Sequence, residues 1–279
     1  MKMTYYNGCV KSKVDVRDYT ICGASRHDVF PDEYVLDLVK VKNQGGTCSC
    51  VAHACSEVME YHNQKETREY TELSTQFIYG YRPLGYYQGK GMSIRDALKT
   101  MHKYGDPTSV VMPGNNEIDD AKKIVTANWN DELLDKAYPF HITSYFKILN
   151  AQDLMHALMT YGPVIANMNW HNHSYLDNNN IYRYDDKDFC GCHAVMIYGW
   201  NEHGWLVQNS WGSSWGDHGR FVIDYEFDFN ELWGVTDTYI ANDEELDRPY
   251  RTVFGSLLAK VFNAVSNFIL LLRSHKEQP

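Results

Sequence analysis

The sequence "VKNQGGTCSCVAHACSE", residues 41–57, places three cysteines within eight positions, directly after a glutamine and two glycines. Cysteines this close together are typical of a metal site, a disulfide cluster or a reactive thiol. Residues 50–62 also carry apolar side chains at helical spacing, and Ser49 is a suitable N-cap. The stretch therefore predicts a helix that begins at or next to Cys50.

The predicted helix start distinguishes the thiols from one another. Backbone N–H groups and the helix dipole favour negative charge at the first turn, so Cys50 is placed to carry a thiolate. Cys55 lies one turn further along an apolar face and is expected in the core. Two histidines are candidate bases for the thiol at the helix start. His53 lies in the same helix, where a histidine is more often a core residue, and His193 lies in "FCGCHAVMIYGW", residues 189–200.

The composition describes a folded globular protein. The chain has 279 residues, enough for about two domains, and 44% of them are hydrophobic. The formal net charge of -10 repels phosphate backbones, so no nucleic-acid partner is expected. Seven cysteines are an odd number, which argues against a disulfide framework. Because no apolar run follows the N-terminus, no secretory signal is expected, and an intracellular or membrane-associated location is favoured.

Helices dominate the first half of the chain and strands the second. Helical patterns cover residues 73–80, 93–104 and 152–160. Short apolar runs that read as strands cover residues 164–170, 193–200, 204–211 and 219–225, with a hairpin turn at residues 201–204. The pattern predicts an α+β protein with a helical lobe, a sheet lobe and a binding cleft between them.

A second motif supports the reactive-thiol interpretation. The segment "QNSWGSSWGDHGRFVI", residues 208–223, contains Asn209, and His193 lies 143 residues beyond Cys50, a separation typical of papain-like enzymes. Together with "LSTQFIY", "YGPV" and "HAVMIYGW" in the same order, these motifs make the chain resemble cathepsin-like cysteine peptidases of the papain family. The resemblance covers residues 14–242 approximately.

The resemblance implies a two-lobed papain-like fold and a cysteine-type peptidase, favoured to be an endopeptidase, that acts on peptides or proteins without a cofactor or metal. It makes Cys50 the nucleophile, His193 the general base and acid, and Asn209 the residue that orients the imidazole. Gln44 would donate to the oxyanion together with the backbone N–H of Cys50. The substrate-binding positions that it implies are Gly89, Gly91, Asn167, Ala194, Trp211 and Trp215.

Two of these positions carry further expectations. Trp211 would cover the hydrogen bond between His193 and Asn209, and Asn167 would make a substrate pocket more polar than is usual in the family. The chain also departs from the family signature, since Cys48 stands where the family has a glycine and Val51 replaces an aromatic residue.

The resemblance also divides the chain into segments. The expected segments are an N-terminal extension at residues 1–13, a peptidase domain at 14–242 with a helical lobe at about 36–138 and a β lobe at about 139–242 plus the N-terminal arm, an acidic linker at 243–252 and a C-terminal helix at 253–272. Because only 49 residues precede Cys50, no inhibitory proregion of the usual size is expected. Residues 1–13 are a candidate cover for the cleft instead.

Residues 253–272 form the most apolar stretch and lie outside the resemblance. A helix of this length spans about 30 Å, the thickness of a bilayer core. Lys260 lies near its centre, and the polar residues form one stripe, so spanning is marginal. We expect membrane association or self-association through this helix, with docking on the catalytic domain as the alternative.

Other readings of the cysteines stay open at this point. One is a zinc site built from Cys48, Cys50, Cys190, Cys192 and His193. Another is a disulfide between two of Cys48, Cys190 and Cys192 that blocks the cleft. A third is an inactive papain-like protein that only binds peptides.

Overall fold

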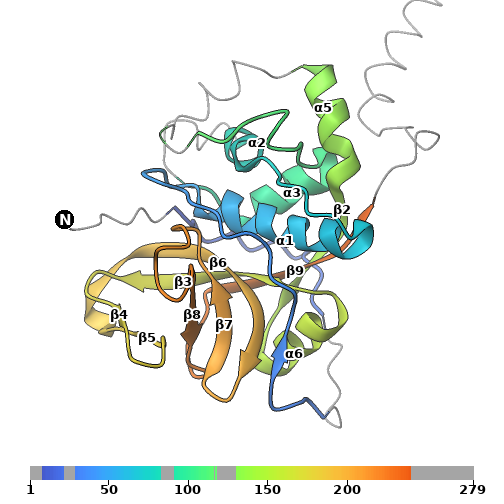
Figure 1. Cartoon of the computed structure of the whole chain (residues 1–279). Coiled ribbons are helices and arrows are strands. Elements are labelled where there is room, and N and C mark those ends of the chain that lie inside the picture. The colour runs from blue at the N-terminus through green and yellow to red at the C-terminus, as the bar shows by residue number, and fades with distance from the viewer. Residues whose placement is uncertain (1–7, 22–28, 83–90, 116, 118–129, 240–279) are drawn as a thin grey trace, which may run out of the picture. The chain divides into compact units, whose positions relative to one another are not determined.

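Most of the helices lie on one side of the molecule and most of the main sheet on the other, while the helix at residues 151–160 lies beside the sheet (Figure 1). The computed structural model describes residues 8–21, 29–82, 91–115, 117 and 130–239. All of them belong to one structural unit, Met1–Tyr239. The predicted linker and C-terminal helix, residues 243–272, lie outside the described residues, as does Gly89.

Five α-helices are described, and four of them match predictions. Their bounds are α1 Cys50–Thr67, α2 Thr75–Gly80, α3 Ile94–Tyr104, α5 Asp131–Ala137 and α6 Ala151–Thr160. A side chain caps the start of α2, α3, α5 and α6 by accepting the backbone N–H of the third helical residue. The capping residues are Ser74, Ser93, Asn130 and Asn150. Helix α5 is the one that sequence patterns missed. Two 3-10 turns, Tyr138–Phe140 and Asp186–Asp188, complete the helical segments described.

The main sheet is antiparallel and has seven strands in the order β2-β9-β3-β6-β7-β8, with β1 paired to β6. The bounds are β1 Tyr34–Val35, β2 His141–Ile148, β3 Val164–His171, β6 Phe189–Asn201, β7 Gly204–Gln208, β8 Arg220–Ile223 and β9 Glu231–Tyr239. The strands β4 Tyr175–Leu176 and β5 Tyr182–Arg183 form a separate hairpin. The predicted turn between β6 and β7 is confirmed, since Asn201 pairs with Gly204.

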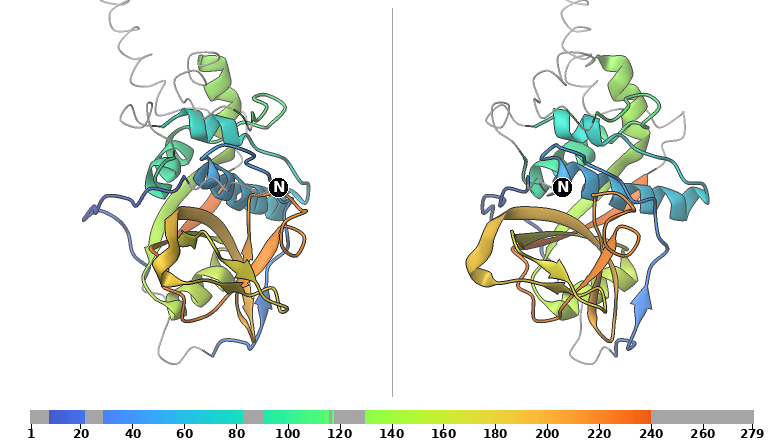
Figure 2. Two further views of the ribbon diagram at one scale, coloured as in Figure 1. Left: turned by 90° about the vertical axis from the view of Figure 1, so that its left-hand side faces the viewer. Right: turned by 60° about the vertical axis from the view of Figure 1, so that its left-hand side comes forward.

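Helix α1 lies between helices α2 and α3 on one side and the sheet on the other, where it packs against β6 (Figures 1 and 2). Its first fourteen residues are buried all round, including polar ones. The carboxylate of Glu60 pairs with Lys42 at 2.6 Å, and Glu57 accepts the backbone N–H of Lys42 at 3.2 Å. These contacts hold α1 in place, and its first residue, Cys50, is fixed at the junction of helices and sheet.

The N-terminal arm, residues 8–21, contacts both the helices and the sheet. Lys147 of β2 exchanges backbone hydrogen bonds with Tyr19 and Ile21. The buried guanidinium of Arg95 in α3 bonds to the carbonyl of Lys13 and to the carboxylate of Asp18. The arm is therefore tied to both parts of the fold.

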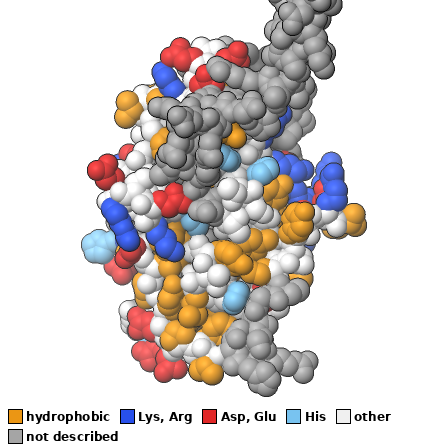
Figure 3. Space-filling view, turned by 90° about the vertical axis from the view of Figure 1, so that its right-hand side faces the viewer, with side chains coloured by type: hydrophobic (Ala, Val, Ile, Leu, Met, Phe, Trp, Pro, Cys, Tyr) orange, Lys and Arg blue, Asp and Glu red, His pale blue; other side chains and the backbone are white. Residues whose placement is uncertain are grey.

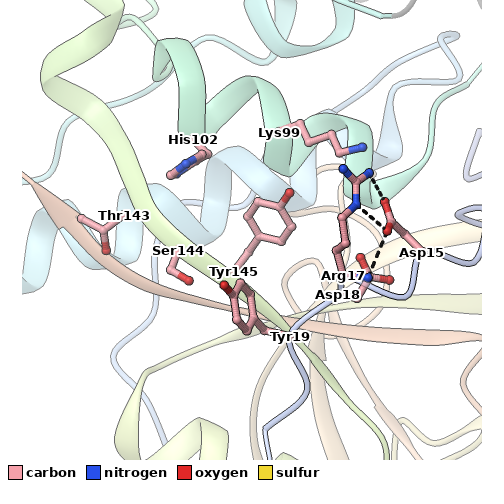
Figure 4. A pocket seen from close by; sticks show the side chains of 9 residues that line it. All are labelled: Asp15, Arg17, Asp18, Tyr19, Lys99, His102, Thr143, Ser144 and Tyr145. Atoms are coloured by element: carbon pink, nitrogen blue, oxygen red, sulfur yellow. Dashed lines mark hydrogen bonds and ion pairs between the residues drawn. The ribbon is translucent and has the colours of Figure 1, made fainter. Parts of the chain in front are cut away.

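A pocket of about 500 Å³ opens between this arm, α3 and β2 (Figure 4). Arg17 and Asp15 of the arm pair across 2.7 Å on one side of it, and Tyr145 of β2 lies on another. No cysteine lines this pocket, so it is separate from the thiol at the start of α1.

Apolar side chains also reach the surface of the described part. Figure 3 shows one face, on which they gather over the lower half beside acidic and basic groups. Among the residues that the structure describes, no helix combines the length and apolar character that crossing a membrane requires.

Candidate active site

Cys50 is the first residue of α1 and is completely buried. Burial raises the pKa of its thiol to about 11, although backbone hydrogen bonds from Ala194, Gly8 and Val51 act in the opposite direction. Ala194 belongs to β6 and directly follows His193 in the sequence. Its backbone hydrogen bond therefore places the Cys50 sulfur beside this part of the strand. In this conformation the thiol is protonated. Ser49 is at the N-cap position as predicted, but its side chain does not cap the helix.

His193 and Asn209 are joined by a hydrogen bond of 2.8 Å between Nε2 and Oδ1. The same oxygen accepts the backbone N–H of Ser210 at 2.8 Å, so it is the amide oxygen and not the nitrogen that faces the ring. Nε2 of His193 must therefore carry the proton of the neutral ring. Nδ1 is then the basic nitrogen, and it is buried with no hydrogen-bond partner among the described residues.

Tryptophan rings shield this pair from water. Trp211 stacks on the imidazole of His193 with ring centroids 4.7 Å apart, and Trp215 packs edge-on against Trp211 at 5.2 Å. Trp170 of β3 contacts both Trp211 and His193. Burial lowers the pKa of His193 to about 4, with the bond to Asn209 opposing the shift. The imidazole is therefore neutral in this conformation.

Gln44 lies between the nucleophile loop and the segment that carries Asn209. Its amide nitrogen donates to the carbonyl of Thr47 at 2.7 Å, and its amide oxygen accepts the hydroxyl of Ser210 at 2.7 Å. Both ends of the side chain are held, so its orientation is fixed. The four predicted catalytic residues thus belong to one buried cluster at the junction of α1 and the sheet.

His53 and Cys55 lie in the core, as a mid-helix histidine and an apolar helix face predict. Nδ1 of His53 bonds to the backbone oxygen of Ser49 at 2.9 Å, one turn back in the same helix. Burial lowers the pKa of His53 to about 4. Cys55 is completely buried, and burial raises the pKa of its thiol.

Residues 8–12, here called the strap, extend along the junction beside Cys50. The backbone N–H of Met92, just before α3, donates to Gly8 at 2.9 Å, and the carbonyl of Met92 accepts the N–H of Val10 at 3.0 Å. Sequence patterns missed Met92 because it acts through its backbone. Its neighbour Gly91, a predicted binding residue, lies so close to Gly8 that a Cβ would overlap the Gly8 carbonyl.

The strap also pairs with the sheet and covers the candidate nucleophile. The N–H of Cys9 donates to the carbonyl of Cys192 in β6 at 3.2 Å. The backbone of Gly8 bonds to the thiol of Cys50, and its Cα lies against Cys48. An extended piece of polypeptide therefore already occupies this part of the junction.

Two further predicted binding positions lie side by side next to the strap. Asn167 of β3 and Ala194 of β6 are register partners and are completely buried. The facing residue on β9 is Glu231, whose carboxylate accepts the N–H and the hydroxyl of Ser12 at 2.9 Å each. Glu231 is a residue that sequence reasoning missed, since a single acidic residue in a strand carries no motif.

Residues 32–240, most of the chain, match the family described as "Papain family cysteine protease".

The chain belongs to the papain family of cysteine proteases. A cysteine protease of Blomia tropicalis is 27% identical over 204 residues, which are 67% of this chain and 58% of that protein. A gut-specific cysteine proteinase of Caenorhabditis elegans is 34% identical over 88 residues, 30% of this chain and 27% of that protein. The chain thus matches between about a quarter and three fifths of the length of these curated relatives.

Solved structures of the papain type share the fold. Xylellain, a cysteine protease from Xylella fastidiosa, superposes with a TM-score of 0.70 at 22% identity and covers 82% of this chain and 95% of its own. The procathepsin B S9 of Trypanosoma congolense superposes with a TM-score of 0.69 at 17% identity, covering 84% and 86%. The predicted α+β, two-lobed papain fold is therefore confirmed.

Papain-family membership accounts for the cysteine cluster better than zinc does. In the described part of the chain, no three His, Cys, Asp or Glu side chains are arranged to hold a metal ion. His193 bonds to Asn209, and the sulfur of Cys192 lies 3.7 Å from Oδ1 of Asn169. Two members of the postulated zinc set, His193 and Cys192, therefore have other contacts.

Proposed function

We propose that this chain is a cysteine peptidase in which Cys50 attacks the peptide carbonyl and His193 moves the protons. The observation that carries the proposal is the Nε2 to Oδ1 bond between His193 and Asn209, because it leaves Nδ1 of His193 unprotonated and able to accept a proton. Nδ1 takes the thiol proton of Cys50, and the resulting thiolate and imidazolium stabilise each other.

The acylation step uses donors on both sides of the nucleophile. As the Cys50 sulfur bonds to the carbonyl carbon, negative charge develops on the oxygen, and the amide of Gln44 and the backbone N–H of Cys50 donate to it. His193 then gives its proton to the leaving amine, and the C–N bond breaks to leave a thioester on Cys50. Water, deprotonated by His193, hydrolyses this thioester and regenerates the thiol.

Asn209 and Trp211 act on the imidazole and not on the substrate. The amide of Asn209 holds the ring in the tautomer that presents Nδ1, and Trp211 covers the ring at 4.7 Å. Exclusion of water strengthens the hydrogen bond between ring and amide. These two residues keep His193 oriented through both proton transfers.

The substrate is an extended peptide or protein segment. Support comes from the strap, which pairs through its backbone with Met92 on one side and Cys192 on the other. A substrate in extended conformation would use the same backbone groups, with its side chains in neighbouring pockets. We infer that Asn167 and Ala194, register partners on β3 and β6, line one such pocket.

The strap also holds the site closed in this conformation. Burial keeps the thiol of Cys50 and the imidazole of His193 neutral, with pKa values of about 11 and 4, so the reactive ion pair does not form beneath the strap. Displacement of residues 8–12 admits water, which favours the charged pair, and opens the site to substrate. We therefore assign the strap an inhibitory role, as the sequence suggested for residues 1–13.

Kinetics on single variants test the proposed function. Cys50→Ala and His193→Ala should lose turnover of a fluorogenic peptide, whereas Cys48→Ala and Cys55→Ala should retain most of it. Circular dichroism checks that each variant is folded. If Cys50→Ala cleaves peptide at the wild-type rate, the chain does not use this thiol; if the wild type binds peptide without cleaving it, the chain is an inactive relative.

Residues 253–272 support a second, independent proposal, that the chain associates with membranes through this segment. Its apolar content and its single polar stripe support the proposal. Flotation with lipid vesicles compares the full chain with a chain that ends at Asp247. Equal recovery of both in the lipid-free fraction would refute membrane association, and a change of oligomeric state alone would indicate self-association instead.

A further inference from the structure

Two thiols that the proposed reaction does not use lie opposite each other where the strap meets β6. Cys9 and Cys192 are register partners in an antiparallel bridge. Directly opposed residues of an antiparallel pair have Cα atoms about 4.5 to 5.5 Å apart and side chains on the same face. Disulfides join residues whose Cα atoms are about 4.4 to 6.8 Å apart. The backbone of this pair therefore fits a disulfide.

The surroundings of Cys9 and Cys192 disfavour negatively charged thiolates and are compatible with an uncharged disulfide. Both cysteines are free in this structure. Burial is the main cause of the raised pKa of each thiol, and the negative charge of Glu231 raises both further. A disulfide carries no charge, so it joins the sulfurs without placing an anion beside Glu231.

We propose that Cys9 and Cys192 form a reversible disulfide that locks the strap over Cys50. This inference rests on the proposed function, because a locked strap controls activity only if Cys50 is the nucleophile. It differs from the alternative of a disulfide between two of Cys48, Cys190 and Cys192, because Cys9 lies opposite Cys192 in the structure.

The exposure of the two thiols indicates the order of events. Cys192 is half-buried, whereas Cys9 is only 8% exposed. The Cys192 thiolate attacks a low-molecular-weight disulfide, which forms a mixed disulfide and releases one small thiol. The Cys9 thiolate then attacks the Cys192 sulfur and releases the second small thiol. Two protein thiols are oxidised to one disulfide, and one small disulfide is reduced to two thiols.

The link changes the opening of the strap from a reversible dissociation to a step that needs reduction. Without it, residues 8–12 are held by the backbone bonds to Met92 and Cys192 and by the bonds from Ser12 to Glu231. With it, the strap segment next to Cys50 cannot leave β6, because Gly8 adjoins the linked residue. The thiol of Cys50 should then be shielded from reagents of any kind.

The test measures the link and the shielding separately. The full chain is equilibrated with oxidised or with reduced glutathione, and unreduced peptide maps are searched for the Cys9–Cys192 pair. The rate at which iodoacetamide alkylates Cys50 is followed by mass spectrometry in the same samples. Under oxidising conditions we expect the linked peptides. The alkylation rate of Cys50 should then be at least about tenfold lower than in the reduced sample, and dithiothreitol should restore it.

Matched variants make the assignment specific. Cys9→Ser and Cys192→Ser should each lose the linked peptides and the oxidant-dependent shielding, whereas Cys190→Ser, at an exposed cysteine two positions away, should keep both. No Cys9–Cys192 peptide in the oxidised wild type, or a linked chain that alkylates at the reduced rate, overturns the proposal. Failure of the proposed function is distinct, since it shows as peptide turnover by Cys50→Ala and leaves the peptide map unchanged.

Discussion

Gly8 of the strap lies so close to Cys48 that a Cβ on Gly8 would overlap the Cys48 carbonyl and lie 2.7 Å from the Cys48 side chain. The smallest side chain at this position is therefore incompatible with the closed strap. We predict that Gly8→Ala displaces the strap and speeds the alkylation of Cys50 by iodoacetamide. Peptide turnover should rise in the same variant, because the site opens to substrate.

A second glycine provides the control for this prediction. At Gly114 an added Cβ would meet no atom nearer than the Thr75 hydroxyl at 3.6 Å, so Gly114→Ala should leave both rates as in the wild type. If Gly8→Ala reacts no faster than Gly114→Ala, the strap does not limit access to Cys50.

Gln44 should contribute to the rate and not to substrate binding. Loss of one oxyanion donor lowers kcat by about 10² to 10³ with little change in KM, and we predict this result for Gln44→Ala. Gln76→Ala is the control, because Gln76 is also a buried glutamine and bonds to the N–H of Asn115 in another part of the fold. A loss of kcat that is equal in the two variants would indicate general destabilisation.

Asn167 should set the polarity of the pocket beside the strap. Its amide nitrogen and oxygen are buried and bond to no group among the described residues. Replacement by an apolar side chain of similar size removes a cost of about 1 to 3 kcal/mol, so Asn167→Val should increase the free energy of unfolding by about that amount. Profiling with a peptide library should show a shift toward apolar side chains. An unchanged profile would exclude Asn167 from the pocket.

Glu57 should make the protein less stable as the pH rises. Burial raises its pKa from 4.5 to about 8 in the folded state. Between these values the native state keeps a proton that the unfolded chain releases, so stability falls with increasing pH across this window. In Glu57→Gln the melting temperature should fall less between pH 5 and pH 8.

The exposed residue Glu132 serves as the control for the pH dependence. The partner Lys136 lowers the pKa of Glu132, so its titration lies below this window, and Glu132→Gln should follow the wild-type curve between pH 5 and pH 8. A wild-type slope in Glu57→Gln would show that other buried acids, such as Asp106, account for the dependence.

The sequence predicted the cluster around Cys50 because each member carries a motif. The predicted helix start and the family resemblance selected Cys50 over Cys48, and the segment around Asn209 selected His193 over His53. The structure places all four predicted catalytic residues in one buried cluster. Their roles stay predictions until kinetics test them.

The features that sequence patterns missed depend on pairing between distant segments. Met92 acts through its backbone, which leaves no side-chain signature. Strand β9 contains Trp233, Val235 and Tyr239, which favour strands, but Gly234 interrupts its pattern, and its pairing with β2 and β3 on either side is not visible in the sequence. The strap is too short for a periodic pattern, so its pairing with Cys192 could not be anticipated.

Site-resolved mass spectrometry of the full chain, during inactivation by a peptidyl thiol-directed electrophile, tests most directly whether Cys50 is the nucleophile that His193 activates. We expect one adduct on Cys50 that accumulates in step with the loss of turnover and forms far more slowly in His193→Ala. An adduct on Cys48 or Cys192 that accompanies inactivation, with Cys50 unmodified, would contradict it.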